Sequence, residues 1–171
     1  MAKKSIVVFF SHTGENYSVG NIKIGNTKRI ADYISAYNGA DQFEVVAQKS
    51  YDMPYNDLIE LAKVEIRNNE YVAYKGDIDL SGYDTVFIGG PVWWGVFPNV
   101  LNSFLKDHAD QLKSKTIAVI TTHEGSGLGS CEADTMMMFP EATFLDGYEC
   151  AGHNTTSAQA RTEKWLKKIG F

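Results

Sequence analysis

The stretch that decides the fold is Ile6–Ile34, IVVFFSHTGENYSVGNIKIGNTKRIADYI. Its first five residues, Ile6–Phe10, form an uninterrupted apolar run, which is typical of a strand buried on both faces. At its far end, Thr27–Tyr37 carries apolar residues at helical spacing and is followed by Asn38-Gly39, a common helix stop. The stretch therefore predicts a central strand, a long polar loop and an amphipathic helix.

The same alternation continues along the rest of the chain. Short apolar runs predict four more strands, and helical patterns lie between them. The expected strands are Phe43–Ala47, Thr85–Ile88, Thr116–Thr121 and the broken run Ala142–Gly152. The expected helices are Asn56–Asn68, Pro98–Lys106 and a C-terminal helix opened by a capping box of Thr156 and Gln159 and ended by Gly170. This order predicts an α/β fold, a doubly wound five-stranded parallel sheet with helices on both faces, in one domain spanning residues 1–171.

Composition narrows the classes of function. The formal net charge is −5 and no block of Lys and Arg occurs, which argues against a nucleic-acid partner. The apolar run near the N-terminus is too short for a signal peptide, and none is long enough to span a membrane. Cys131 and Cys150 have neither redox-pair nor metal-ligand spacing, and fit either free thiols or one disulfide. We expect a cytoplasmic protein with no membrane association and no metal site.

Ligands of such sheets bind beyond the carboxyl ends of the strands, so the loops there carry the functional signal. The first loop offers hydroxyl and amide groups, and its glycines permit a close approach of the backbone. It leads into the helix that begins near Thr27, where free N–H groups and the helix dipole favour an anion such as phosphate. The alternative is a capped helix with a polar surface loop. The candidate residues are Ser11, Thr13, Gly14, Asn26 and Thr27.

Two further loops follow central strands. Gly89–Asn99, GGPVWWGVFPN, places two adjacent tryptophans where both are hard to bury, because consecutive residues point in different directions. They could present a flat face to a planar ligand, or one or both could pack beneath the next helix. Thr121–Cys131, TTHEGSGLGSC, has three alternating glycines but lacks dinucleotide-fingerprint spacing. Together the loops indicate a phosphate at the first and a planar ring between the second and third, a combination that fits flavin mononucleotide (FMN).

The segments FFSHTG…GNTKRIA, YDTVFIGGPVWWGVFPNVLNSFL and THEGSGLGS resemble the flavodoxin family, in particular flavodoxin-like bacterial proteins with a PxWWG second loop. The resemblance covers nearly the whole chain. It implies the strand order 2-1-3-4-5 and non-covalent FMN at the carboxyl edge of the sheet. It assigns phosphate binding to the candidate residues of the first loop. The isoalloxazine ring would lie between two sets of residues: Pro91, Val92, Trp93, Trp94 and Gly95 on one side, and His123, Glu124, Gly125 and Gly127 on the other.

The first loop departs from the family pattern. A family phosphate loop runs S-x-T-G-N-T without a break, whereas about eleven residues, Glu15–Gly25, separate the two halves here. We expect this insertion to form a flap beside the phosphate or the ribityl chain. Whether Asn16, Tyr17 or Asn26 reaches the ligand is not determined by the sequence.

Three functions are compatible with these features. The first is an FMN-binding electron carrier that serves redox partner proteins. The second is an FMN-dependent NAD(P)H or quinone oxidoreductase with a small-molecule electron acceptor. The third is a non-redox interaction module on the same fold. Two loop residues have open roles: His123 is either a proton donor at the ring edge or a cap for local backbone, and Glu124 either tunes the flavin potential or faces solvent.

Overall fold

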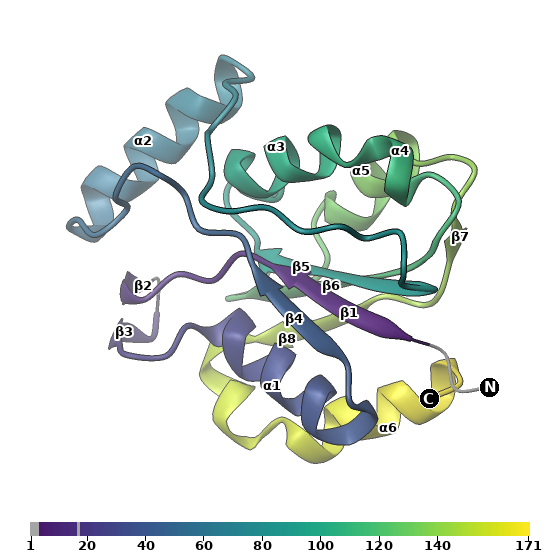
Figure 1. Ribbon diagram of the computed structural model, residues 1–171. Helices are drawn as coiled ribbons and strands as arrows, with labels where there is room; N and C mark the ends of the chain where they lie inside the picture. The colour runs from purple at the N-terminus through teal and green to yellow at the C-terminus, as the bar shows by residue number, and fades with distance from the viewer. Residues whose placement is uncertain (1–3, 17) are drawn as a thin grey trace.

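The computed structural model describes residues 4–16 and 18–171 (Figure 1). Its centre is a parallel sheet in the order β4-β1-β5-β6, and two short strands, β7 and β8, pair with successive parts of β6. These two strands share the fifth position, which confirms the predicted sheet, its order 2-1-3-4-5 and the break in its last strand. The strands are β1 (Ser5–Phe9), β4 (Asp41–Glu44), β5 (Thr85–Pro91), β6 (Thr116–His123), β7 (Thr143–Phe144) and β8 (Tyr148–Ala151).

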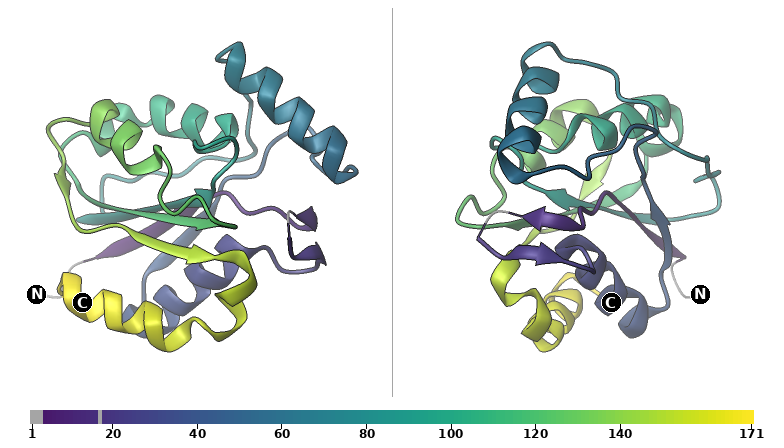
Figure 2. Two further views of the ribbon diagram at one scale, coloured as in Figure 1. Left: turned by 180° about the vertical axis from the view of Figure 1, so that it is seen from behind. Right: turned by 90° about the vertical axis from the view of Figure 1, so that its left-hand side faces the viewer.

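Helices cover both faces of the sheet (Figures 1 and 2). Helices α1 and α6 lie on one face, and α3, α4 and α5 lie on the other, while α2 stands out from the second layer. The helices are α1 (Asn26–Asn38), α2 (Tyr55–Arg67), α3 (Asn99–Asp107), α4 (Ala109–Leu112), α5 (Cys131–Met138) and α6 (Gln159–Ile169), with a 3-10 helix, η1 (Gly152–Ser157), before α6. The left-handed Gly39 and Gly170 end α1 and α6, as predicted.

The core explains why the central strands are continuously apolar. Along β1, Ile6 and Val8 face the layer of α3 to α5, whereas Val7 and Phe9 face α1 and α6. The same alternation holds in β5 and β6. Because both faces of these strands are covered, neither face requires polar residues.

Strand β5 is longer than predicted. The sequence places its end at Ile88, but pairing with β6 continues through Gly89 and Gly90 to Pro91. A Cβ atom on Gly89 would lie 3.3 Å from Cγ2 of Thr27, and one on Gly90 would lie 3.1 Å from the Phe97 ring. These glycines therefore permit close packing of α1 and of the start of α3 against the strand, and they do not belong to the loop in which the sequence placed them.

Two other boundaries were predicted wrongly. Strand β4 ends at Glu44 instead of Ala47. Its last bond to β1 is Val45 N–H to Phe9 O at 2.7 Å, and beyond it the chain leaves β1 and forms an isolated bridge between Ala47 and Tyr74. The capping box of Thr156 and Gln159 does not form. Thr156 belongs to η1, and within the described residues no side chain caps α6.

The insertion folds into a small antiparallel hairpin of β2 (Gly14–Asn16) and β3 (Gly20–Ile22). It projects beyond the sheet edge beside the start of α1 (Figure 1). The expectation for Tyr17 lies outside the described residues. Cys131 and Cys150 are both buried free thiols. Within residues 4–16 and 18–171, no helix combines the length and the apolar character that crossing a bilayer requires.

Candidate functional site

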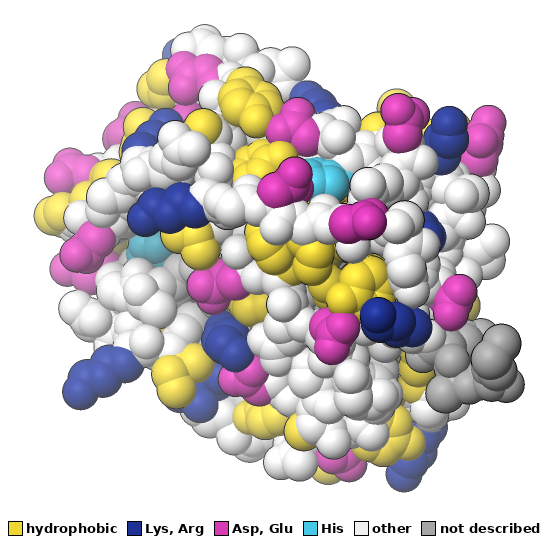
Figure 3. Space-filling view, viewed as in Figure 1, with side chains coloured by type: hydrophobic (Ala, Val, Ile, Leu, Met, Phe, Trp, Pro, Cys, Tyr) yellow, Lys and Arg dark blue, Asp and Glu magenta, His cyan; other side chains and the backbone are white. Residues whose placement is uncertain are grey.

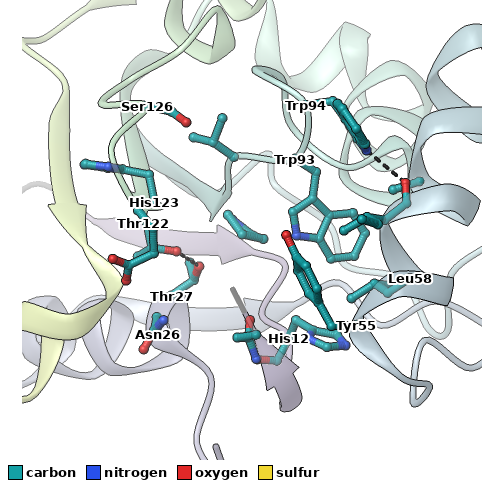
Figure 4. A pocket seen from close by; sticks show the side chains of 16 residues that line it. His12, Asn26, Thr27, Tyr55, Leu58, Trp93, Trp94, Thr122, His123 and Ser126 are labelled. Carbon is teal, nitrogen blue, oxygen red and sulfur yellow. Dashed lines mark hydrogen bonds between the residues drawn. The ribbon is translucent and has the colours of Figure 1, made fainter. Parts of the chain in front are cut away.

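A cavity of about 260 Å³ opens where the carboxyl ends of β5 and β6 meet the start of α1 (Figure 4). Polar side chains lie at the α1 side, and aromatic and aliphatic side chains lie at the α2 side. The lining residues are His12, Asn16, Asn26, Thr27, Tyr55, Leu58, Ile59, Ala62, Pro91, Val92, Trp93, Trp94, Thr122, His123, Glu124 and Ser126. The cavity therefore combines hydrogen-bonding groups at one end with a flat aromatic wall at the other.

The polar end is built around the first turn of α1. Ser11 Oγ accepts the Lys28 N–H at 3.1 Å, so a residue distant in sequence caps this helix. A Cβ atom on Gly25 would lie 1.9 Å from Ser11 Oγ, which makes glycine necessary there. The hydroxyl groups of Thr27 and Thr122 are 2.8 Å apart in the buried wall. The remaining N–H groups of the first turn have no acceptor within the helix, and this end of the cavity suits an anion.

The two tryptophans have different environments. Trp93 packs against the core, with edge-to-face contacts to Phe10 and Tyr51 at centroid distances of 5.3 and 5.5 Å. Trp94 is 54% exposed, and its Nε1–H donates to Ile59 O of α2 at 2.9 Å. Trp94 and Gly95 both have positive φ angles, 54° and 82°, in a two-residue turn. A bulky side chain held in this conformation is strained, a feature that often accompanies functional sites.

The glycines of the third loop bring it against the second. Gly125, Gly127 and Gly129 all have positive φ angles. A Cβ atom on Gly129 would lie 2.6 Å from Gly95 O, and the next residue, Ser130, donates its N–H to the same oxygen at 2.8 Å. The two loops thus form one continuous rim of the cavity.

The hydrogen bonds of His123 distinguish between the two roles that the sequence left open for it. His123 Nδ1 accepts the Gly125 N–H at 2.9 Å, and Nε2 contacts the Glu149 carboxylate, which also accepts from Arg161 at 2.9 Å. Both ring nitrogens of His123 are therefore occupied, which favours backbone capping over proton donation. The His123 hydrogen bond, with the help of Arg161, lowers the pKa of Glu149.

Glu124 does not face solvent, because its side chain is only 10% exposed and lines the cavity. Its two oxygens accept from the backbone N–H of His153 at 2.8 Å and contact His153 Nδ1 at 2.6 Å. A Cβ atom on Gly152 would lie 2.5 Å from both Glu124 Oε1 and Asn26 Nδ2. Glycine at 152 therefore lets the segment before α6 close over the polar end of the cavity.

The sequence did not indicate that α2 forms a wall of the cavity. Tyr55, Leu58, Ile59 and Ala62 line it from this helix. The inserted hairpin supports the wall, because the Glu15 carboxylate accepts the Tyr55 N–H at 2.7 Å, where the dipole of α2 favours a negative charge.

A buried acidic residue fixes the other end of α2. Glu65 is 1% exposed, pairs with Lys49 and accepts a hydrogen bond from the Tyr51 hydroxyl at 2.9 Å. Burial, followed by the charge of Glu65, raises the pKa of Tyr51, so its hydroxyl stays protonated and donates. This contact connects α2 to the aromatic cluster around Trp93.

The structure divides the predicted site residues into two groups. Those that line the cavity are Asn26, Thr27, Pro91, Val92, Trp93, Trp94, His123 and Glu124. Those that do not line it are Ser11, Thr13, Gly14, Gly95, Gly125 and Gly127. Ser11 and Thr13 instead border a neighbouring hollow next to Val46–Asp52, because the hairpin separates the two halves of the first loop. Asn16, the undecided residue of the insertion, does line the cavity.

Comparison with known proteins identifies the family. A family model described as flavodoxin matches residues 4–169, and the chain belongs to this family. A search of curated proteins finds no match. A solved structure from Bacteroides eggerthii, proposed to be a flavoprotein, shares 26% identity over 99% of both chains, with a TM-score of 0.77. A flavoprotein from Lactobacillus acidophilus, solved in complex with FMN, shares 22% identity over 96% of this chain and 99% of that chain, with a TM-score of 0.66.

Proposed function

We propose that this protein binds FMN non-covalently and transfers electrons through it. The observation that carries the proposal is that one cavity extends from the first turn of α1 to the aromatic wall at Trp93. Membership of the flavodoxin family and the FMN complex of a relative support it. When bound, FMN supplies the redox chemistry, and the protein supplies binding, orientation and electrostatics.

The residues fit the two chemically different ends of FMN. N–H groups of the first turn of α1 and the Thr27 hydroxyl would hold the phosphate without a basic side chain. Trp93 and the rim formed by the second and third loops would enclose the ring and exclude water from one of its faces. Glu124, held by His153, places a carboxylate in the same cavity, where it would disfavour additional negative charge on the flavin.

A second candidate is an FMN-dependent NAD(P)H or quinone oxidoreductase. The apolar wall from α2 is the observation that favours it, because Leu58, Ile59 and Ala62 add room for a small substrate beside the aromatic wall. The carrier remains our first proposal. It rests on membership of the flavodoxin family. Acidic and basic side chains are interspersed over the face in Figure 3, so this face presents no large patch of a single charge that would point to a particular partner. The buried free thiols also fit a cytoplasmic location.

Titration of the dialysed protein into FMN, with riboflavin as the phosphate-free control, tests the binding step. We expect saturable quenching of flavin fluorescence and tighter binding of FMN. Thr27→Ala should weaken FMN more than riboflavin, whereas Thr156→Ala, an exposed site outside the cavity, should change neither. No quenching by either flavin would contradict the proposal and favour the interaction module.

Reduction of the FMN-loaded protein separates the two redox roles. A carrier should remain oxidised when mixed with NADH or NADPH alone and should become reduced when a flavoprotein reductase is added. Rapid reduction by a nicotinamide cofactor alone would favour the oxidoreductase.

A further inference from the structure

His12 is a buried residue of the cavity wall that the proposed function does not yet use. Its side chain is at the base of the cavity (Figure 4). Nε2 lies 3.1 Å from Tyr51 O. Because a carbonyl oxygen only accepts, this contact places the proton of the neutral imidazole on Nε2. Nδ1 is then a bare acceptor.

Nδ1 of His12 is buried and has no hydrogen-bond partner among residues 4–16 and 18–171. A buried acceptor without a partner typically costs about 1–3 kcal/mol, so proteins rarely retain one without a reason. His108, which is similarly buried, shows the ordinary arrangement: Nδ1 lies 2.8 Å from Phe104 O and Nε2 lies 2.6 Å from Asp77 Oδ1. The contrast singles out Nδ1 of His12 as an acceptor in the cavity wall whose donor is still to be identified.

The position of His12 identifies which part of the ligand reaches it. A Cβ atom on Gly25 would lie 3.1 Å from His12 O, so the His12 backbone abuts the turn that opens α1. The His12 ring meets the Trp93 ring edge-to-face at 5.9 Å. The residue therefore spans the distance between the proposed phosphate end and the proposed ring end of the cavity. In FMN the ribityl chain joins these two parts, and its hydroxyl groups are hydrogen-bond donors.

We propose that Nδ1 of His12 accepts a hydrogen bond from a ribityl hydroxyl group of the flavin. This inference rests on the proposed function, since it requires the flavin to occupy the cavity. It makes His12 a specificity-determining residue that distinguishes flavins with a ribityl chain from those without one.

Two variants separate the two ring nitrogens. His12→Gln keeps a donor near the position of Nε2 and removes the acceptor at Nδ1, whereas His12→Asn keeps an acceptor near the position of Nδ1. Each is titrated with riboflavin and with lumiflavin, which carries the same ring but a methyl group in place of the ribityl chain. We expect His12→Gln to weaken riboflavin binding about fivefold, the typical effect of one neutral hydrogen bond. Lumiflavin binding should not change, and His12→Asn should retain the riboflavin affinity.

His108→Phe is the control for the general cost of losing a buried histidine, because His108 lies outside the cavity. It should lower stability and leave both flavin affinities unchanged. Unchanged riboflavin affinity in His12→Gln, or an equal loss for riboflavin and lumiflavin, would overturn the inference while leaving FMN binding intact. A wild-type protein that binds no flavin would overturn the proposed function itself, and the inference with it.

A measurement on the wild-type protein avoids any folding defect of the variants. The ¹⁵N chemical shift of His12 Nδ1 reports directly on a hydrogen bond to that atom. It should move further on binding riboflavin than on binding lumiflavin. Equal displacement by the two ligands would overturn the inference.

Discussion

The contact between the second and third loops gives a quantitative prediction. In Gly129→Ala, the new Cβ atom would lie 2.6 Å from Gly95 O, on a backbone with φ of +53°. The Gly95 oxygen is part of the main chain and also accepts the Ser130 N–H, so it can move only if the whole turn moves. We expect a loss of unfolding free energy of about 2–4 kcal/mol, roughly 1 from the left-handed backbone and about 1–3 from overpacking.

Gly127→Ala is the matched control for this variant. Its φ is +60°, but nothing lies within 4 Å of the added Cβ atom, so only the backbone cost of about 1 kcal/mol applies. Urea unfolding measures both losses, and flavin titration measures the effect on the cavity. We expect Gly129→Ala to be the less stable variant and to bind FMN more weakly, because the two loops separate. Equal losses in the two variants would refute the reasoning.

Three further predictions concern other parts of the chain. Trp94→Asn should leave the unfolding free energy nearly unchanged and should weaken FMN binding. Asparagine tolerates the positive φ angle of this turn, a gain of about 1 kcal/mol, and the lost hydrogen bond to Ile59 O costs about 1 kcal/mol. An unaltered FMN affinity would remove Trp94 from the site. Cys131 and Cys150 should resist a thiol reagent in the folded protein, because burial raises both pKa values, that of Cys131 to about 12; rapid labelling before unfolding would contradict this. The pKa of Glu149 is lowered below its ordinary value of 4.5, so the stabilising contribution of its carboxylate is present above pH 4.5 and is lost on acidification below it. E149Q should therefore show a flatter dependence of the unfolding free energy on pH in this acidic range. An unchanged dependence would exclude Glu149 as a contributor.

The sheet could be predicted from the sequence because its central strands are apolar on both faces. This pattern has few alternatives in an alternating strand–helix chain. The helix ends at Gly39 and Gly170 could also be predicted, since a left-handed C-cap favours glycine. Sequence patterns gave wrong boundaries where contacts between distant residues determine the local structure. The sequence assigns Gly89 and Gly90 to the loop after the strand, yet they belong to β5, where the absence of a side chain lets neighbouring elements approach closely.

The candidate site was predicted in part for the same reason. Asn26, Trp93 and Glu124 follow strand ends or begin a helix, so the topology brings them together without knowledge of the loops. The wall from α2 depends on contacts between distant residues, such as Glu15 with Tyr55 and Trp94 with Ile59. No short-range pattern in the sequence encodes these contacts.

The structure of the protein crystallised with FMN would test the central claim most directly. The account predicts the phosphate at the first turn of α1 near Thr27, the ring against Trp93 and the rim of the third loop, and the ribityl chain beside His12. Flavin bound elsewhere, or the ring at the α1 end of the cavity, would contradict it.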